Sequence, residues 1–136
     1  MGVNVKGMTP LLQVFDMPAS LKFYCDVLGF QIVTTDANTV PPNHNWVWLR
    51  LNGSDLMLNT AYEHAKRPLS PDPARVASHR DTALYFGAPD VDAVCAHLRA
   101  KGIEVKEPRV APYGMKQLYS RDPDGFELCF QWEASR

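Results

Sequence analysis

Residues 16–29 decide the fold, because they describe one complete helix with both ends marked. The stretch reads DMPASLKFYCDVLG: Asp16 opens it, Pro18 suits a first helical turn, and Gly29 is a natural C-terminal cap. Apolar residues recur along it at helical spacing, namely Leu21, Tyr24, Val27 and Leu28. We therefore expect a helix over residues 17–28 with one apolar face.

A second stretch repeats this design at residues 90–102, which read DVDAVCAHLRAKG. Asp90 opens it 74 positions after Asp16, and Gly102 ends it 73 positions after Gly29. Its apolar stripe consists of Val91, Val94, Cys95 and Leu98. Two helices with the same markers at nearly one offset indicate an internal repeat.

Strand-like segments surround both helices in the same order. We expect strands over 9–15, 30–35, 46–51 and 55–60 in the first half, and over 82–87, 103–106, 116–120 and 126–132 in the second. Each half has a turn signal before its last strand, Asn52-Gly53 and Asp122–Gly125. The prediction is an α+β fold of two βαβββ modules, residues 8–60 and 80–133, which together form one domain. The proline-rich stretch 61–79 links them.

Composition excludes several classes of function. The 136 residues carry a net charge of −1, and the pI near 6.4 argues against a nucleic-acid partner. No apolar run approaches the roughly 20 residues of a membrane span, and the start has no apolar signal core. Three cysteines at positions 25, 95 and 129 form no disulfide framework, so we expect a cytoplasmic protein.

The repeat resembles the vicinal oxygen chelate superfamily, which includes glyoxalase I, bleomycin-resistance proteins and extradiol dioxygenases. The resemblance is carried by Val14-Phe15-Asp16, Ser20–Tyr24, Val27–Phe30, Asp90–Ala93, Lys101-Gly102 and Asp122–Gly125. It covers nearly the whole chain. It implies a curled mixed sheet around a small-molecule cleft, and usually a homodimer.

Alternation along the strands separates a helix-facing side from an opposite side, where the resemblance places the ligand. Trp46, Trp48 and Arg50 fall on the opposite side, and two indoles beside a guanidinium suit a planar or anionic ligand. The full set of predicted ligand-binding residues is Gln13, Trp46, Trp48, Arg50, Asn59, Tyr85, Tyr113, Met115, Gln117, Tyr119 and Cys129.

Each of these residues also has a simpler interpretation. The tryptophans could be core residues, and Arg50 could form a salt bridge with Glu127. The stretch 112–119 could be an exposed hairpin or a subunit contact, and Cys129 without an adjacent base is more typical of an inert apolar residue. The four histidines, His44, His64, His79 and His97, form no metal-binding motif, and His44 is of interest because it lies just before the Trp46 strand.

Enzymes of the superfamily hold a divalent metal with His, Glu or Gln at four positions. By the resemblance, these positions are occupied here by Thr9, Met57 or Asn59, Ala83 or Thr82, and Cys129. None is His or Glu, so we expect no metal, no cofactor and no catalytic residue.

The leading hypothesis is a protein of the bleomycin-resistance type that binds a small aromatic or polar molecule without a metal and without turnover. One alternative is a metal-dependent lyase or isomerase of the glyoxalase type, or a dioxygenase, with ligands placed elsewhere. Another is an interaction module with a vestigial pocket, in which the tryptophans are packed by the protein's own side chains.

Overall fold

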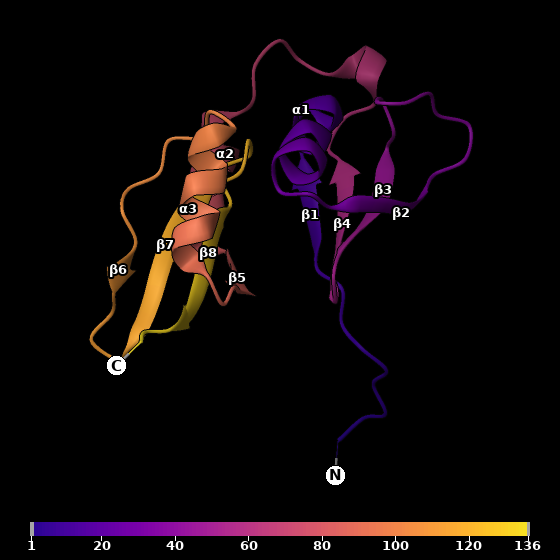
Figure 1. The fold of residues 1–136 in the computed structure, drawn as a ribbon. Helices are drawn as coiled ribbons and strands as arrows, with labels where there is room; N and C mark the ends of the chain where they lie inside the picture. The colour runs from indigo at the N-terminus through magenta and orange to yellow at the C-terminus, as the bar shows by residue number, and fades with distance from the viewer. Residues whose placement is uncertain (1, 136) are drawn as a thin grey trace. The chain divides into compact units, whose positions relative to one another are not determined.

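The computed structural model describes residues 2–135. It divides into two compact units, with the boundary in the sequence between Leu69 and Ser70. Each unit contains one four-stranded mixed sheet with a helix against one face (Figure 1). We call them the N-terminal unit and the C-terminal unit. The division falls within the proline-rich stretch 61–79.

The N-terminal unit has the strand order β1-β4-β3-β2, in which β1 runs parallel to β4 and the other pairs are antiparallel. Its strands are β1 (Leu11–Val14), β2 (Gln31–Thr35), β3 (Trp46–Leu51) and β4 (Ser54–Thr60). Helix α1 (Met17–Leu21) continues as the π-helical segment η1 (Lys22–Val27), and a short 3₁₀ turn, η2 (His64–Lys66), follows the sheet.

The C-terminal unit repeats this order as β5-β8-β7-β6, again with one parallel pair, β5 and β8. It begins with α2 (Pro73–Ser78) and η3 (His79–Asp81). Its remaining elements are β5 (Ala83–Gly87), α3 (Val91–Ala100), β6 (Arg109–Val110), β7 (Met115–Arg121) and β8 (Glu127–Glu133). The predicted α+β fold of two βαβββ modules is therefore confirmed.

The predicted capping residues at both ends of the two helices are confirmed. Asp16 Oδ1 accepts a hydrogen bond from Ala19 N at 3.1 Å, and Asp90 Oδ1 accepts one from Ala93 N at 3.0 Å. These side chains satisfy amide groups that a helix N-terminus otherwise leaves unpaired. Gly29 and Gly102 end the helices with φ of +96° and +82°, a conformation that favours glycine.

The core of each unit lies between its helix and the alternate residues of its strands. In the N-terminal unit Val47, Leu49, Leu56 and Leu58 are buried on the helix side of the sheet, as the alternation predicts. In the C-terminal unit the corresponding buried residues are Leu118, Leu128 and Phe130. We use the term open face for the opposite side of each sheet.

The predicted strand over 103–106 is wrong, because this segment does not pair with a neighbouring strand, and the outer strand is the two-residue β6 instead. Arg99 donates to the carbonyl oxygen of Val105 at 3.0 Å and to the carboxylate of Glu107 at 2.8 Å. These contacts hold the segment near the end of α3. Pro108 then interrupts the backbone donors that a continuous strand would use.

Part of the proline-rich stretch is folded against the C-terminal unit. Arg75 in α2 pairs with Asp124 at 3.2 Å, and His79 Nδ1 lies 2.7 Å from the Asp124 carbonyl oxygen. The His79 ring stacks on Phe126 with centroids 3.9 Å apart. Residues 73–81 thus clasp the turn that leads into β8.

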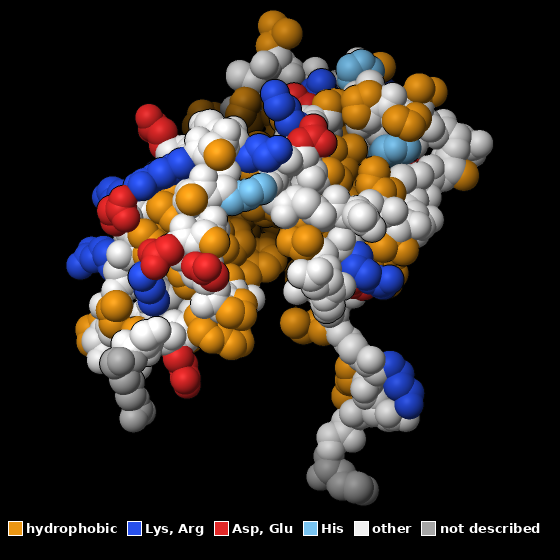
Figure 2. Space-filling view, in the orientation of Figure 1, with side chains coloured by type: hydrophobic (Ala, Val, Ile, Leu, Met, Phe, Trp, Pro, Cys, Tyr) orange, Lys and Arg blue, Asp and Glu red, His pale blue; other side chains and the backbone are white. Residues whose placement is uncertain are grey.

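The surface carries charges of both signs. Figure 2 shows lysine, arginine and acidic side chains interspersed on the face drawn, without a broad region of one sign. The face drawn thus has no extended basic footprint for a nucleic acid, in agreement with the near-neutral net charge. Among residues 2–135, no helix is long and apolar enough to cross a bilayer.

Candidate functional site

The open face of the N-terminal unit carries five of the predicted residues, namely Gln13, Trp46, Trp48, Arg50 and Asn59. Strand register places Gln13, Asn59 and Trp46 in one row across three strands. Met57 and Trp48 lie in the next row. The indoles of Trp46 and Trp48 meet edge to face with centroids 6.5 Å apart, and both are half-buried. The pair forms an aromatic surface flanked by two amide side chains.

Arg50 completes this face but is already paired. Its Nε and Nη2 atoms bind the Asp55 carboxylate at 2.7 and 2.9 Å, so the alternative partner considered from the sequence, Glu127, is replaced by Asp55. The Trp48 indole N–H also donates to Asp55, at 3.0 Å. The hydrogen bond from Arg50 is the main cause that lowers the pKa of Asp55. The pair braces Trp48, and the Nε and Nη2 edge of the guanidinium is used by Asp55, while the Arg50 side chain is 52% exposed.

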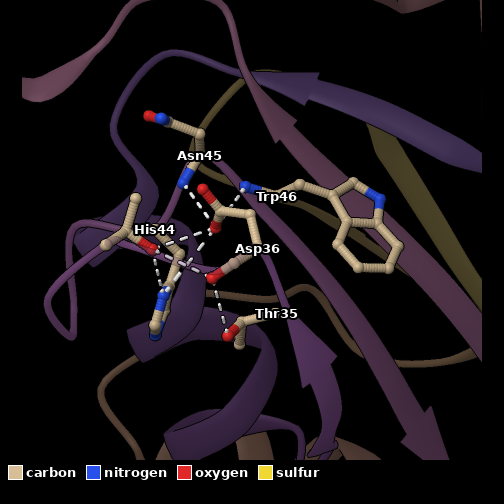
Figure 3. Close-up of polar contacts among 6 residues, drawn as sticks. Thr35, Asp36, His44, Asn45 and Trp46 are labelled. Carbon is tan, nitrogen blue, oxygen red and sulfur yellow. Dashed lines mark hydrogen bonds and ion pairs between the residues drawn. The ribbon is translucent and has the colours of Figure 1, made fainter.

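A loop anchor beside Trp46 was missed by the sequence analysis. Figure 3 shows Asp36 at the centre of the loop, where its Oδ1 accepts from Asn45 N at 3.1 Å and from Trp46 N at 3.3 Å. Thr39 donates to the same oxygen at 3.0 Å and lies 2.9 Å from His44 Nδ1. The buried His44 is thus held by the loop itself. The sequence marked His44 by its place before the Trp46 strand, but not its partners Thr39 and Asp36.

The protonation of Asp36 follows from these contacts. Its partial burial alone would raise its pKa, but the hydrogen bonds from Trp46, Thr39 and Asn45 outweigh that effect and lower the pKa. The carboxylate is therefore ionised at neutral pH and fixes the backbone where Trp46 enters β3.

The open face of the C-terminal unit carries a network of phenols and amides. The Tyr119 hydroxyl donates to Gln117 Oε1 at 3.1 Å and lies 3.4 Å from the Tyr85 hydroxyl. Gln117 Nε2 donates in turn to the Tyr113 hydroxyl at 2.8 Å and to Gln131 Oε1 at 2.9 Å. Four predicted residues, Tyr85, Tyr113, Gln117 and Tyr119, are thus connected, and Gln131 joins them.

Cys129 and Tyr119 are both neutral groups in this network. Burial raises the pKa of the Cys129 thiol, which is 0% exposed beneath the network. The contact with Tyr85, followed by burial, raises the pKa of Tyr119. A protonated thiol and a protonated phenol can both take part in hydrogen bonds.

A cavity of about 710 Å³ adjoins this network. Gln117 and Tyr119 line it on one side, and residues 103–107 and 109–112 line it on the other. The volume lies within the range of ordinary small-molecule sites. Met115, predicted as a further wall, is half-buried at the start of β7 and does not line the cavity. The lining residues 103–107 were not predicted, because the alternation over 103–106 predicted a strand.

The positions that hold the metal in related enzymes do not fit a divalent cation here. Leu11 and Tyr85 are equivalent positions of the repeat, 74 residues apart like Asp16 and Asp90. The register places Met57 opposite Leu11 and Cys129 opposite Tyr85, so Met57, not Asn59, corresponds to Cys129. A thioether, a buried protonated thiol, the Thr9 hydroxyl and the Ala83 methyl group are not a Lewis-acid donor set. Within residues 2–135, no three His, Cys, Asp or Glu side chains gather as a metal site.

These features can be compared with known proteins. The model of the glyoxalase/bleomycin resistance protein/dioxygenase superfamily matches residues 8–130. The chain belongs to this superfamily. It is 32% identical over 117 residues to the uncharacterized protein YaeR of Escherichia coli (strain K12), covering 83% of this chain and 84% of YaeR.

Solved structures with the same fold cover nearly the whole chain. SMU.1112c matches with a TM-score of 0.76 and 26% identity, over 95% of this chain and all of that one. A bleomycin-binding protein, solved in complex with bleomycin, matches with a TM-score of 0.69 and 20% identity, over 96% and 100%. The fold expected from the sequence resemblance is therefore confirmed.

Proposed function

We propose that this superfamily member binds a small molecule that combines an aromatic ring with hydrogen-bonding groups, and that it does so without a metal and without turnover. The observation that carries the proposal is the Tyr85–Tyr119–Gln117 network beside the cavity in the C-terminal unit. Phenol and amide groups offer both donors and acceptors, which orient a ligand.

Two further observations support this class of ligand. The Trp46–Trp48 pair offers a second aromatic surface, held in place by Asp36 and by the Asp55–Arg50 pair. One protein of the same fold binds bleomycin. Bleomycin is thus a reasonable first probe for this chain.

Calorimetric titration of the full chain with bleomycin tests the proposal. We expect saturable binding that Gln117→Ala weakens by about tenfold or more, since losing a hydrogen-bonding partner in a buried site costs about 1–3 kcal/mol. Trp132→Phe, an exposed aromatic on β8, serves as the matched control and leaves the affinity unchanged. Absence of heat at high micromolar bleomycin would exclude that drug, and absence for a wider set of aromatic antibiotics would overturn the proposal.

We propose further that the protein is a cytoplasmic homodimer. The support for the dimer is the superfamily resemblance, and the support for the location is the free state of Cys25, Cys95 and Cys129 in the described structure, which suits a reducing compartment. Light scattering after size-exclusion chromatography tests the dimer: a mass of one chain at micromolar concentration would refute it.

A further inference from the structure

The outer edge of β7 is only partly covered. Strand β6 pairs with β7 through Arg109 with Gln117 and Val110 with Lys116. Within residues 2–135, no strand pairs with 118–121 on that side, whereas β2 covers β3 from Val47 to Arg50 in the N-terminal unit. An uncovered strand edge presents unpaired backbone N–H and C=O groups that can accept another strand.

The hydrogen bonds flanking β7 show which of its backbone groups face this open edge. Ala111 N donates to Met115 O at 2.8 Å on the β6 side, and Asp122 N donates to Phe126 O at 3.0 Å on the β8 side. Because bonding directions alternate along an antiparallel strand, the N–H and C=O groups of Tyr119 and Arg121 point to the open edge. Continuing the β6 register places Glu107 opposite Tyr119 and Val105 opposite Arg121.

Residues 103–106 alternate apolar and charged side chains, as strands do. In the continued register Lys106 would lie on the helix-facing side with the buried Ser120, and Val105 would lie on the open face with Arg121. Pro108 would lie opposite Leu118, at a position of the ladder where no N–H is required. The segment is thus compatible with pairing but is not paired.

The Arg99 contacts hold the segment in its present position. Arg99 donates a hydrogen bond to the Val105 carbonyl oxygen at 3.0 Å. The same oxygen would accept from Arg121 N in the continued ladder. Arg99 also holds the Glu107 carboxylate at 2.8 Å. The Arg99 contacts and the ladder therefore use the same backbone acceptor.

An orphaned side chain marks the place where pairing would occur. Ser120 is 7% exposed, and its Oγ has no hydrogen-bond partner in the described structure. Ser120 also lines the cavity of about 710 Å³ that separates the segment from β7. In the continued register Lys106 would lie directly opposite it. A buried hydroxyl without a partner is costly, which favours an alternative arrangement that supplies one.

We propose that residues 104–108 form a strap with two positions. In the position described here, Arg99 holds the strap and the cavity is open; in the other, the strap pairs with Tyr119 and Arg121 and closes the cavity. Since Gln117 and Tyr119 line this cavity, the strap controls access to the ligand. That controlling role rests on the proposed function, but the two positions can be tested without any ligand.

Hydrogen exchange of the full chain, followed by NMR, is the first test. Arg99→Gln frees the strap, so the amides of Tyr119 and Arg121 exchange more slowly than in the wild type, by about tenfold. Lys101→Gln is the matched control, because it removes an exposed positive charge from the same helix end, and it leaves these two amides unchanged. Unchanged or faster exchange at both amides in Arg99→Gln would overturn the proposal.

A crosslink is the second test, with Cys25→Ser as background. Lys106→Cys with Ser120→Cys places two thiols directly opposite each other in the paired position, at a spacing that suits a disulfide. Mild oxidation joins them, and Arg99→Gln accelerates the reaction. Glu104→Cys with Ser120→Cys is out of register and stays reduced. Equal crosslinking of both pairs, or none in either, contradicts the strap, and neither result depends on ligand binding.

Discussion

The two units share one backbone plan but have different open faces. Register relates Trp48 to Tyr119 and Met57 to Cys129, and it relates Trp46 to Gln117. The N-terminal unit places indoles at two of these three positions, whereas the C-terminal unit places a phenol and an amide there. The helix-facing positions are apolar in both. The repeat therefore keeps the residues that fold the module, while the open face varies.

The largest effect is expected where the units agree. Leu56 and Leu128 occupy equivalent, buried positions beneath their helices. We expect Leu56→Ala and Leu128→Ala each to lower the free energy of unfolding by about 2–5 kcal/mol, because each leaves a cavity in a packed core. Urea denaturation measures this. A loss below 1 kcal/mol for one of them would show that the two cores are not equivalent.

The turns before the last strands should differ between the two units in how much they contribute to stability. Asp122 is buried, and its Oδ1 accepts from Asp124 N and Phe126 N, both at 2.9 Å, whereas Asn52 is exposed with φ of +53°. Asp122→Ala leaves two donors unpaired and costs about 2–3 kcal/mol. Asn52→Ala introduces only backbone strain and costs about 1 kcal/mol. Equal losses in urea denaturation would contradict this ranking.

The Asp36 anchor gives the N-terminal unit a pH dependence of its own. The pKa of Asp36 lies below its ordinary value of 3.8. Its contribution to the free energy of unfolding is therefore complete above that pH, and it disappears as the pH falls through the lower, folded-state value. We expect Asp36→Asn to cost about 1 kcal/mol at pH 7 and less at pH 3, because below pH 3.8 protonation of this side chain favours the unfolded chain. Urea denaturation of both proteins at the two pH values measures the difference, and a difference that stays constant with pH would refute the assignment.

The smallest effect concerns thiol chemistry at one position of the repeat. In a Cys25→Ser background, Met57→Cys should place a thiol on the half-buried open face of the N-terminal unit. We expect iodoacetamide to modify it on the order of tenfold faster than Cys129, because burial keeps the Cys129 thiol protonated and inaccessible. Mass spectrometry of peptides reports both rates. Faster modification of Cys129 would show that its cover opens readily.

The sequence predicts local features of this fold well. The caps at Asp16 and Asp90, both turn signals and most strands follow from residue types that act on their own neighbours. The failed strand over 103–106 depends on Arg99, a residue of another element that takes the backbone acceptor of Val105. Alternation alone carries no information about such a competitor.

The candidate site, too, is predicted from the sequence only in its local features. Alternation correctly assigns Trp48 and Tyr119 to open faces, because strand geometry fixes the side on which each residue lies. Pairing is not fixed in that way: Arg50 binds Asp55, its cross-strand neighbour beyond the turn, and Asp36 gathers three donors from a loop. These partners depend on loop and turn geometry, which composition does not define.

The clasp of residues 73–81 on the turn before β8 has a practical consequence for dissecting the protein. A fragment that begins at residue 80 keeps the whole second βαβββ module but loses Arg75 and His79. The buried carboxylate of Asp124 would then lack its cation, and Phe126 would lose the ring stacked on it. Fragments meant to compare the halves should therefore be divided near residue 70, so that the second half keeps its own clasp.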